Sequence, residues 1–213
     1  MQQKYNISSD SGVLEAVLDQ PKSNYIEDLI VIICHPHPLF DGTMHNKVVV
    51  TISRAFNAMG ISAMRFNYRG VGLSQGHYDN GVGEVDDAIA VADYILQHKI
   101  AKKIIFAGFS FGGSVAYKAV SRCKQSCALL TIAPAVVNFP LLDSTAPQVT
   151  WCTVQGVDDE VVESSAVFDF VTNKSIADAY LIKLNNVGHF FHGQLVKLKS
   201  EIIWHYKPKL ELY

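Results

Sequence analysis

Hydrophobic and polar positions along the chain follow two periods in turn, and these predict strands that alternate with helices. Residues 29–34 (LIVIIC) are continuously apolar, which is typical of a strand buried on both faces. Residues 46–59 instead repeat apolar side chains at helical spacing and end at a glycine. The same patterns recur, with strands expected over 61–66, 103–107, 128–133, 149–155 and 180–184, helices over 84–98, 114–120, 164–172 and around 195–203, and an edge strand over 12–19.

This alternation determines the fold class that we expect. Strands that alternate with helices form a mostly parallel β-sheet with helices on both faces, so we predict a doubly wound α/β fold. The 213 residues contain no Pro/Gly/Ser-rich linker, charge block or repeat, and we expect a single domain over residues 1–213. In such sheets, ligands bind beyond the carboxyl ends of the strands.

A serine stands at one of these strand ends. Residues 108–113 (GFSFGG) follow an expected strand and precede an expected helix. A strand that turns sharply into a helix at Gly-x-Ser-x-Gly is a nucleophile elbow, in which the serine backbone is strained and side chains two residues away would collide with neighbouring elements. We therefore interpret Ser110 as a nucleophile. The alternative is a glycine-rich turn between a strand and a helix, in which the serine has no catalytic role.

Later strand ends supply the acid and the base that a serine nucleophile needs. Asp158 and Asp159 both follow the strand over 149–155, and the spacing Gly-x-x-Asp-x-x-Val favours Asp159, since Asp158 can bind the amides of its own turn. His189 and His192 both follow the strand over 180–184. The position of His189, after a glycine in the loop that leaves the strand, favours it as the base, and a capping or packing role is expected for His192.

An oxyanion hole requires two backbone N–H groups. One is expected from Phe111, the residue after the nucleophile, and the other from the loop over residues 35–44 (HPHPLFDGTM). The two prolines of this loop have no N–H, which leaves His37, Leu39 and Phe40 as donors. A cis bond before Pro38 is compatible with the sequence.

Two other patterns give only weak indications of a metal site and of a dinucleotide site. The spacing His35-x-His37, with His45 nearby, suggests a metal site, but alternate residues of a proline-rich loop seldom converge without a carboxylate pair. The Gly-x-Gly within residues 69–74 lacks the third glycine and the following helix of a dinucleotide site. We therefore expect no metal and no cofactor.

The composition of the chain limits which partners and which cellular compartment we expect. The chain is 49% hydrophobic and 18% charged with a net charge of −2, which is typical of a soluble globular protein and argues against nucleic acid as the main partner. It contains no membrane-spanning apolar run and no signal-peptide core, so we expect a cytoplasmic protein without membrane contact. Its four cysteines are expected to be reduced, with a regulatory Cys123–Cys127 disulfide as the alternative; the set is Cys34, Cys123, Cys127 and Cys152.

Taken together, these motifs resemble those of the α/β-hydrolases over nearly the whole chain. More narrowly, the chain is similar to a group of small, lidless bacterial hydrolases that carry a His-Pro-His-Pro loop. The resemblance implies a Ser110–His189–Asp159 triad, with Phe111 and the His37 region as the oxyanion hole. The usual glycine of the group after Phe40 is Asp41 here. The motifs lie at residues 35–44, 65–74, 108–112, 155–162 and 188–193.

The expected reaction is acyl transfer to water by a serine hydrolase. The segment 135–148 is too short for a large interfacial lid, so we expect an open pocket lined by Phe40, Phe109, Phe139 and Phe190. Such a pocket favours small apolar acyl esters or thioesters. A serine peptidase or amidase, and a non-catalytic interaction protein with this fold, are the alternatives; the sequence does not predict the oligomeric state.

Overall fold

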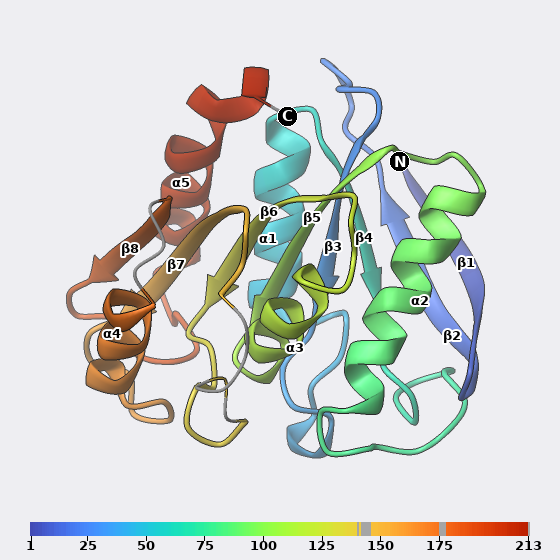
Figure 1. Cartoon of the computed structure of the whole chain (residues 1–213). Helices are drawn as coiled ribbons and strands as arrows, with labels where there is room; N and C mark the ends of the chain where they lie inside the picture. Colours follow the sequence, from blue (N-terminus) through green and yellow to red (C-terminus); the bar gives the residue numbers. More distant parts are fainter. Residues whose placement is uncertain (140, 142–145, 175–177, 213) are drawn as a thin grey trace.

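A computed structural model describes residues 1–139, 141, 146–174 and 178–212, and within them the chain forms one eight-stranded sheet (Figure 1). The strand order is β1-β2-β4-β3-β5-β6-β7-β8. β1 is antiparallel to β2 and β2 to β4, whereas all other neighbours are parallel. The strands are β1 (Gln2–Ser9), β2 (Gly12–Asp19), β3 (Leu29–Cys34), β4 (Ser62–Phe66), β5 (Lys103–Phe109), β6 (Ser126–Ile132), β7 (Thr150–Gly156) and β8 (Ala179–Leu184).

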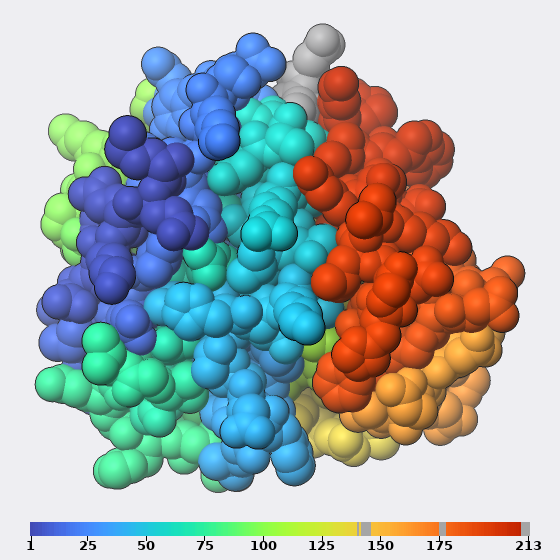
Figure 2. Space-filling view, turned by 180° about the vertical axis from the view of Figure 1, so that it is seen from behind, coloured from blue at the N-terminus to red at the C-terminus, as the bar shows by residue number. Residues whose placement is uncertain are grey.

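Helices cover both faces of this sheet, and the predicted doubly wound α/β fold is confirmed. α1 (Lys47–Ala58) and α5 (Leu195–Tyr206) pack side by side on one face, which Figure 2 shows from behind. α2 (Gly83–Gln97), α3 (Phe111–Val120) and α4 (Ser164–Asn173) cover the other. Two 3-10 helices, η1 (Pro38–Phe40) and η2 (Lys207–Leu212), complete the described elements. None of the helices in these ranges is both long and apolar enough to cross a membrane.

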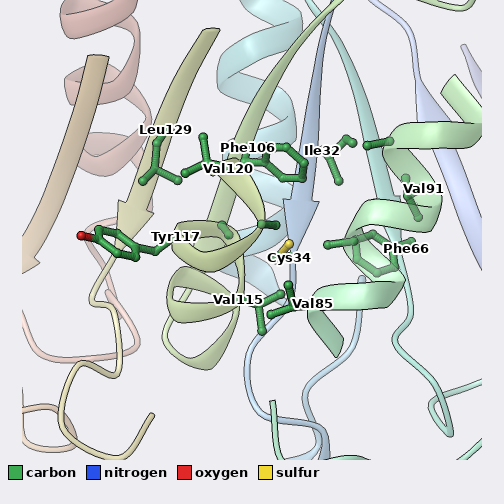
Figure 3. Packing of buried hydrophobic residues seen from close by; sticks show 14 of the residues in the cluster. Ile32, Cys34, Phe66, Val85, Val91, Phe106, Val115, Tyr117, Val120 and Leu129 are labelled. Atoms are coloured by element: carbon green, nitrogen blue, oxygen red, sulfur yellow. The ribbon is translucent and has the colours of Figure 1, made fainter. Parts of the chain in front are cut away.

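The central strands contribute side chains to two hydrophobic cores, one on each face of the sheet. In β3, Val31 and Ile33 belong to the core under α1 and α5, while Ile32 and Cys34 belong to the core under α2 and α3. Figure 3 shows part of the second of these, where Val85 of α2 and Val115 of α3 meet residues of the strands. Because successive side chains of a strand point to opposite faces, a strand covered on both faces is continuously apolar, as expected from the sequence.

The edge of the sheet differs from the prediction. Gly12–Asp19 was expected at the edge, but β2 lies between β1 and β4, and β1 forms the edge. β1 has no apolar alternation that would predict a strand, since only Ile7 among its eight residues is buried. A single domain over 1–213 stays a prediction. In the segment 135–148, residues 140 and 142–145 lie outside the described residues, and the rest of it forms no helix or strand.

The parallel strands place the candidate residues at one edge. β3, β5, β6, β7 and β8 all end at the lower edge in Figure 1. β5, which leads to the Gly-x-Ser-x-Gly turn, lies between β3 and β6. Loops that leave β3 and β4 therefore approach this turn from one side, and loops that leave β7 and β8 approach it from the other.

Candidate active site

Ser110 occupies the sharp turn between β5 and α3. Its backbone has φ 54° and ψ −120°, a conformation that a residue with a side chain rarely adopts. Hydrogen bonds on both sides hold it: the Ser110 N–H donates to Ile132 O at 2.8 Å, and Ser110 O accepts from the N–H groups of Gly113 at 2.9 Å and Ala135 at 3.2 Å. The neighbouring strand and the first turn of α3 thus enforce the strain.

The two flanking glycines are required by close backbone approach, as the sequence predicted. A Cβ atom on Gly108 would overlap the carbonyl group of Gly112. A Cβ atom on Gly112 would overlap the carbonyl oxygens of Cys34 and His35, at the end of β3. The second overlap also shows that the first turn of α3 packs directly against the start of the loop over 35–44.

The structure brings together the three residues that the sequence favoured. His189 Nε2 lies 3.0 Å from Ser110 Oγ, and His189 Nδ1 lies 2.9 Å from Asp159 Oδ2 and 3.1 Å from Asp159 Oδ1. The His189 side chain is 3% exposed and that of Asp159 is 0% exposed, so water does not compete for these bonds. This arrangement allows the imidazole to accept the hydroxyl proton while the carboxylate orients the ring.

Asp159 is held as an ionised carboxylate. Burial raises its pKa, but hydrogen bonds from His189 and from the N–H groups of Val162 and Val161 outweigh this, so its pKa lies below its ordinary value. Gln155 Nε2 donates to Asp159 Oδ2 at 2.9 Å. Asp158, the alternative acid, is exposed in the adjoining turn, where its N–H donates to Val187 O.

Glu160, an exposed residue next to Asp159, contacts the backbone of the loop after β8. Glu160 Oε2 accepts the N–H of His189 at 3.1 Å. The carboxylate therefore links the loop after β7 to the loop after β8, next to the pair formed by Asp159 and His189. His192, the alternative base, is exposed and its ring lies 5.7 Å from that of Phe190.

The loop after β3 and the first turn of α3 each leave one of the predicted N–H donors without an acceptor. Within the loop, the N–H of Leu39 donates to His37 Nδ1 and the N–H of Phe40 donates to His37 O. The N–H of Leu39, predicted as an oxyanion donor, is therefore already used in a hydrogen bond within the loop. Among the described residues, the N–H groups of His37 and Phe111 have no acceptor, and the His37 and Phe111 rings are 5.0 Å apart.

The backbone of this loop is settled at two positions that the sequence left open, Pro38 and Asp41. The peptide bond before Pro38 is trans, not cis. Asp41, which stands where a glycine is usual, has φ 57° and ψ 22° and ends η1 in the left-handed region. Aspartate tolerates this region better than most residues, so the loop keeps the conformation that a glycine would allow.

His35 is a buried link between two loops. Its Nδ1 lies 2.7 Å from Pro36 O, and its Nε2 accepts the N–H of Tyr68 at 3.2 Å, so both ring nitrogens are used inside the fold. Burial lowers the pKa of His35 to about 3, although the bond to Pro36 opposes this. The described residues bring together no group of three side chains that could hold a metal ion.

The predicted pocket residues divide between the surface and the core. Phe40 is 81% exposed and Phe190 is 46% exposed, while Phe139 is half-buried with its ring 4.5 Å from that of Phe111. Phe109 was also predicted to line the pocket, but it is fully buried, with its ring 5.0 Å from His189 and 6.4 Å from Phe191. As the last residue of β5 it points into the core behind His189, because strand residues alternate between faces.

The cysteines are all free thiols. Cys123 and Cys127 therefore form no disulfide. Burial raises the pKa of Cys34 and Cys152 to about 12, so these thiols stay protonated.

The comparison with known proteins agrees with this fold. The family model described as serine aminopeptidase, S33 matches residues 29–152. An uncharacterised protein of Rickettsia prowazekii (strain Madrid E) is 37% identical over 182 residues, which cover 81% of this chain and 76% of that protein.

Two solved structures support the same relationship. An alpha-beta serine hydrolase homologue from Coxiella burnetii is 39% identical, with a TM-score of 0.88 over 95% of this chain and 96% of that one. XC6422 from Xanthomonas campestris, described as an α/β serine hydrolase without a lid, is 32% identical, with a TM-score of 0.91 over 97% of this chain and 94% of that one. The chain therefore belongs to the serine aminopeptidase S33 family and has the fold of the α/β serine hydrolases.

Proposed function

We propose that this chain hydrolyses small apolar acyl esters or thioesters, with Ser110 as the nucleophile, His189 as the base and Asp159 as the orienting acid. The observation that carries the proposal is the hydrogen-bonded chain from Ser110 Oγ through His189 to Asp159. It lies at the carboxyl ends of parallel strands, where ligands bind in this class of sheet.

The reaction proceeds in two acyl transfers. Ser110 Oγ attacks the carbonyl carbon while its proton passes to His189 Nε2, and His189 then gives that proton to the leaving group, which breaks the ester or thioester bond. Water attacks the acyl-enzyme, passes a proton to His189 and releases the acid, and the proton returns to Ser110. The low pKa of Asp159 keeps its carboxylate ionised beside the imidazolium that forms in each half.

The N–H groups of Phe111 and His37 are the proposed oxyanion donors. Phe111 is the first residue of α3, so its N–H has no partner within the helix and lies at the positive end of the helix dipole. Removing one such donor typically lowers the rate by about 10²–10³-fold. Two trans X–Pro bonds and the His37–Leu39 hydrogen bond stiffen the loop that presents the second donor.

Apolar side chains around this chain of hydrogen bonds support an apolar acyl substrate. Phe40 and Leu39 are exposed on the oxyanion side, and Phe190, whose ring lies 5.1 Å from that of His189, is exposed on the other. Large exposed apolar side chains that gather at one place are typical of a binding surface.

A peptidase or amidase is the second candidate, and the description of the matching family favours it. The same three residues would cleave an amide bond, but an amine is a poorer leaving group than an alcohol or a thiol. Parallel panels of acyl esters, thioesters and amides with matched acyl groups separate the two candidates. Faster cleavage of the amides would replace the ester proposal.

The experiment that tests the nucleophile uses two matched variants. Ser110→Ala removes the proposed nucleophile, and Ser114→Ala removes a buried hydroxyl of α3 that has no hydrogen-bond partner among the described residues. We expect Ser110→Ala to lose at least about 10³-fold in kcat/KM on short aryl esters and all labelling by a fluorophosphonate probe. Ser114→Ala should retain both.

Two results would contradict the proposal. Hydrolysis by Ser110→Ala at the wild-type rate would exclude Ser110 as the nucleophile. A wild-type protein that neither hydrolyses the panel nor labels with the probe would favour a non-catalytic interaction protein with this fold.

A further inference from the structure

The His37 side chain has a defined tautomer. Its Nδ1 accepts the N–H of Leu39 at 3.2 Å, so Nδ1 carries no proton. Burial lowers the pKa of His37 despite the nearby Glu84 carboxylate, which keeps the ring neutral at pH 7. A neutral imidazole with an unprotonated Nδ1 carries its proton on Nε2. His37 Nε2 is 3.2 Å from Tyr78 Oη, so the imidazole is the donor in this bond.

This leaves the phenol proton of Tyr78 available. Tyr78 Oη accepts from His37, and in the described part of the chain no other group forms a hydrogen bond with it. Burial raises the pKa of Tyr78, and the negative charge of Glu84 adds to this, so the hydroxyl keeps its proton at neutral and mildly basic pH. Tyr78 is half-buried, so its side chain is not sealed inside the core.

The Tyr78 side chain is held in place from two directions. Its ring lies 5.1 Å from that of His37 and 6.2 Å from that of Phe111. The chain after Tyr78 is anchored by the fully buried Glu84, whose carboxylate accepts the N–H of Asp79 at 2.8 Å and that of Gly81 at 2.7 Å. A donor that is fixed before the substrate arrives stabilises a developing charge without first reorganising.

The position of Tyr78 relative to the nucleophile indicates what it would contact. His37 comes from the loop after β3 and Tyr78 from the loop after β4, on one side of β5. The acid and the base come from the loops after β7 and β8, on the other side. Tyr78 is therefore placed on the side of the proposed oxyanion donors and away from the proton path through His189.

We propose that the Tyr78 hydroxyl donates a third hydrogen bond to the carbonyl oxygen of the acyl group, beside the N–H groups of Phe111 and His37. This inference rests on the proposed function. The bond strengthens as the carbonyl oxygen gains negative charge, so Tyr78 acts mainly on the transition state. A substrate whose carbonyl oxygen is replaced by a weaker acceptor gains less from it.

The test compares Tyr78→Phe with Tyr94→Phe on two substrates. Tyr78→Phe removes the hydroxyl and keeps the ring, and Tyr94→Phe makes the same change on α2, where the ring stacks on His98. The substrates are an aryl ester and its thionoester, in which sulfur replaces the carbonyl oxygen. We expect Tyr78→Phe to lower kcat/KM on the ester at least about 10-fold, mainly through kcat, with a much smaller loss on the thionoester. Tyr94→Phe should match the wild type on both.

The ratio of the two activities does not depend on how much of the variant is folded, so partial misfolding cannot imitate the result. Wild-type kcat/KM on the ester in Tyr78→Phe would overturn the inference. Equal losses on both substrates would also overturn it, since they indicate a packing role for the phenol. In both cases the proposed function still stands if Ser110→Ala is inactive. An active Ser110→Ala variant would instead overturn the proposed function and the inference together.

Discussion

At the scale of single residues, the ring of His35 is held inside the protein as a neutral imidazole. Its Nδ1 faces Pro36 O and its Nε2 faces the N–H of Tyr68, and the side chain is completely buried. Protonation would place a charge in an apolar environment and remove the acceptor for Tyr68. This histidine therefore links stability to pH.

The protein should lose stability as the pH falls below the ordinary pKa of histidine. The pKa of His35 is lowered from 6.5 to about 3 in the folded state, so the unfolded state binds the proton first and each step toward lower pH favours unfolding. Between pH 7 and pH 4 the loss from this residue is about 3 kcal/mol. Urea unfolding across this range measures it, and the slope should flatten in His35→Gln, which retains an acceptor for Tyr68.

His205 is the control for this measurement. Burial, with the charge of Lys209 adding to it, lowers the pKa of His205 to about 4, so this residue of α5 contributes a separate loss. His205→Gln should flatten the slope by a smaller amount than His35→Gln does. An unchanged slope in His35→Gln would show that this ring is not the group that titrates on unfolding.

At the scale of elements, the elbow depends on Gly112 more than on its neighbour Gly113. A Cβ atom at Gly112 would overlap the backbone carbonyl oxygens of Cys34 and His35. Cys34 ends β3, which pairs with β4 on one side and β5 on the other, so the sheet resists a shift of this backbone. A Cβ atom at Gly113 would lie 3.1 Å from Pro134 Cβ, which is tight but short of overlap. Alanine also favours a helix by about 1 kcal/mol over glycine, which offsets part of the second effect.

We therefore expect Gly112→Ala to destabilise the protein by more than about 3 kcal/mol, or to prevent folding, and Gly113→Ala to change stability by about 1 kcal/mol or less. The free energy of unfolding from urea titrations of the two variants measures the difference. Equal stabilities would show that α3 can shift away from the end of β3, in which case Gly112 is not required for the turn.

The strands that could be predicted from the sequence are those whose own side chains show a clear apolar pattern. β3 and β5 are apolar on both faces, so period and length alone indicate buried strands. β1 carries no such signal, because its pairing with β2 comes from backbone hydrogen bonds and only Ile7 is buried. The candidate nucleophile could be predicted for the same reason, because Ser110 lies in the local motif Gly-x-Ser-x-Gly.

Contacts between distant loops could not be predicted in this way. Tyr78 meets His37 across 41 residues of sequence, and Glu160 meets the N–H of His189 across 29. Tyr78 lies outside the motifs and Glu160 lies inside one, but each acquires its partner only when parallel strands bring their loops to one edge. Phe109 is a different case, because it lies inside the motif and its position was still predicted wrongly. It was expected to line the pocket, but its place in the strand directs its side chain into the core.

At the scale of the whole molecule, the two hydrophobic cores share the strands between them. Residues of β3, β5 and β7 alternate between the core under α1 and α5 and the core under α2, α3 and α4. Neither face can lose its helices without exposing one side of strands that the other face needs. We therefore propose that residues 1–213 unfold as one cooperative domain.

The two tryptophans allow this to be tested, because they lie in different environments. Trp151 of β7 is fully buried against Tyr117 and Phe170, whereas Trp204 of α5 is 73% exposed on the opposite face. In Trp204→Phe, fluorescence reports only the core around Trp151, and far-ultraviolet circular dichroism reports helices on both faces. We expect the two signals to give the same urea midpoint and the same slope. Separate midpoints would mean that one layer of helices unfolds while the other still holds the sheet.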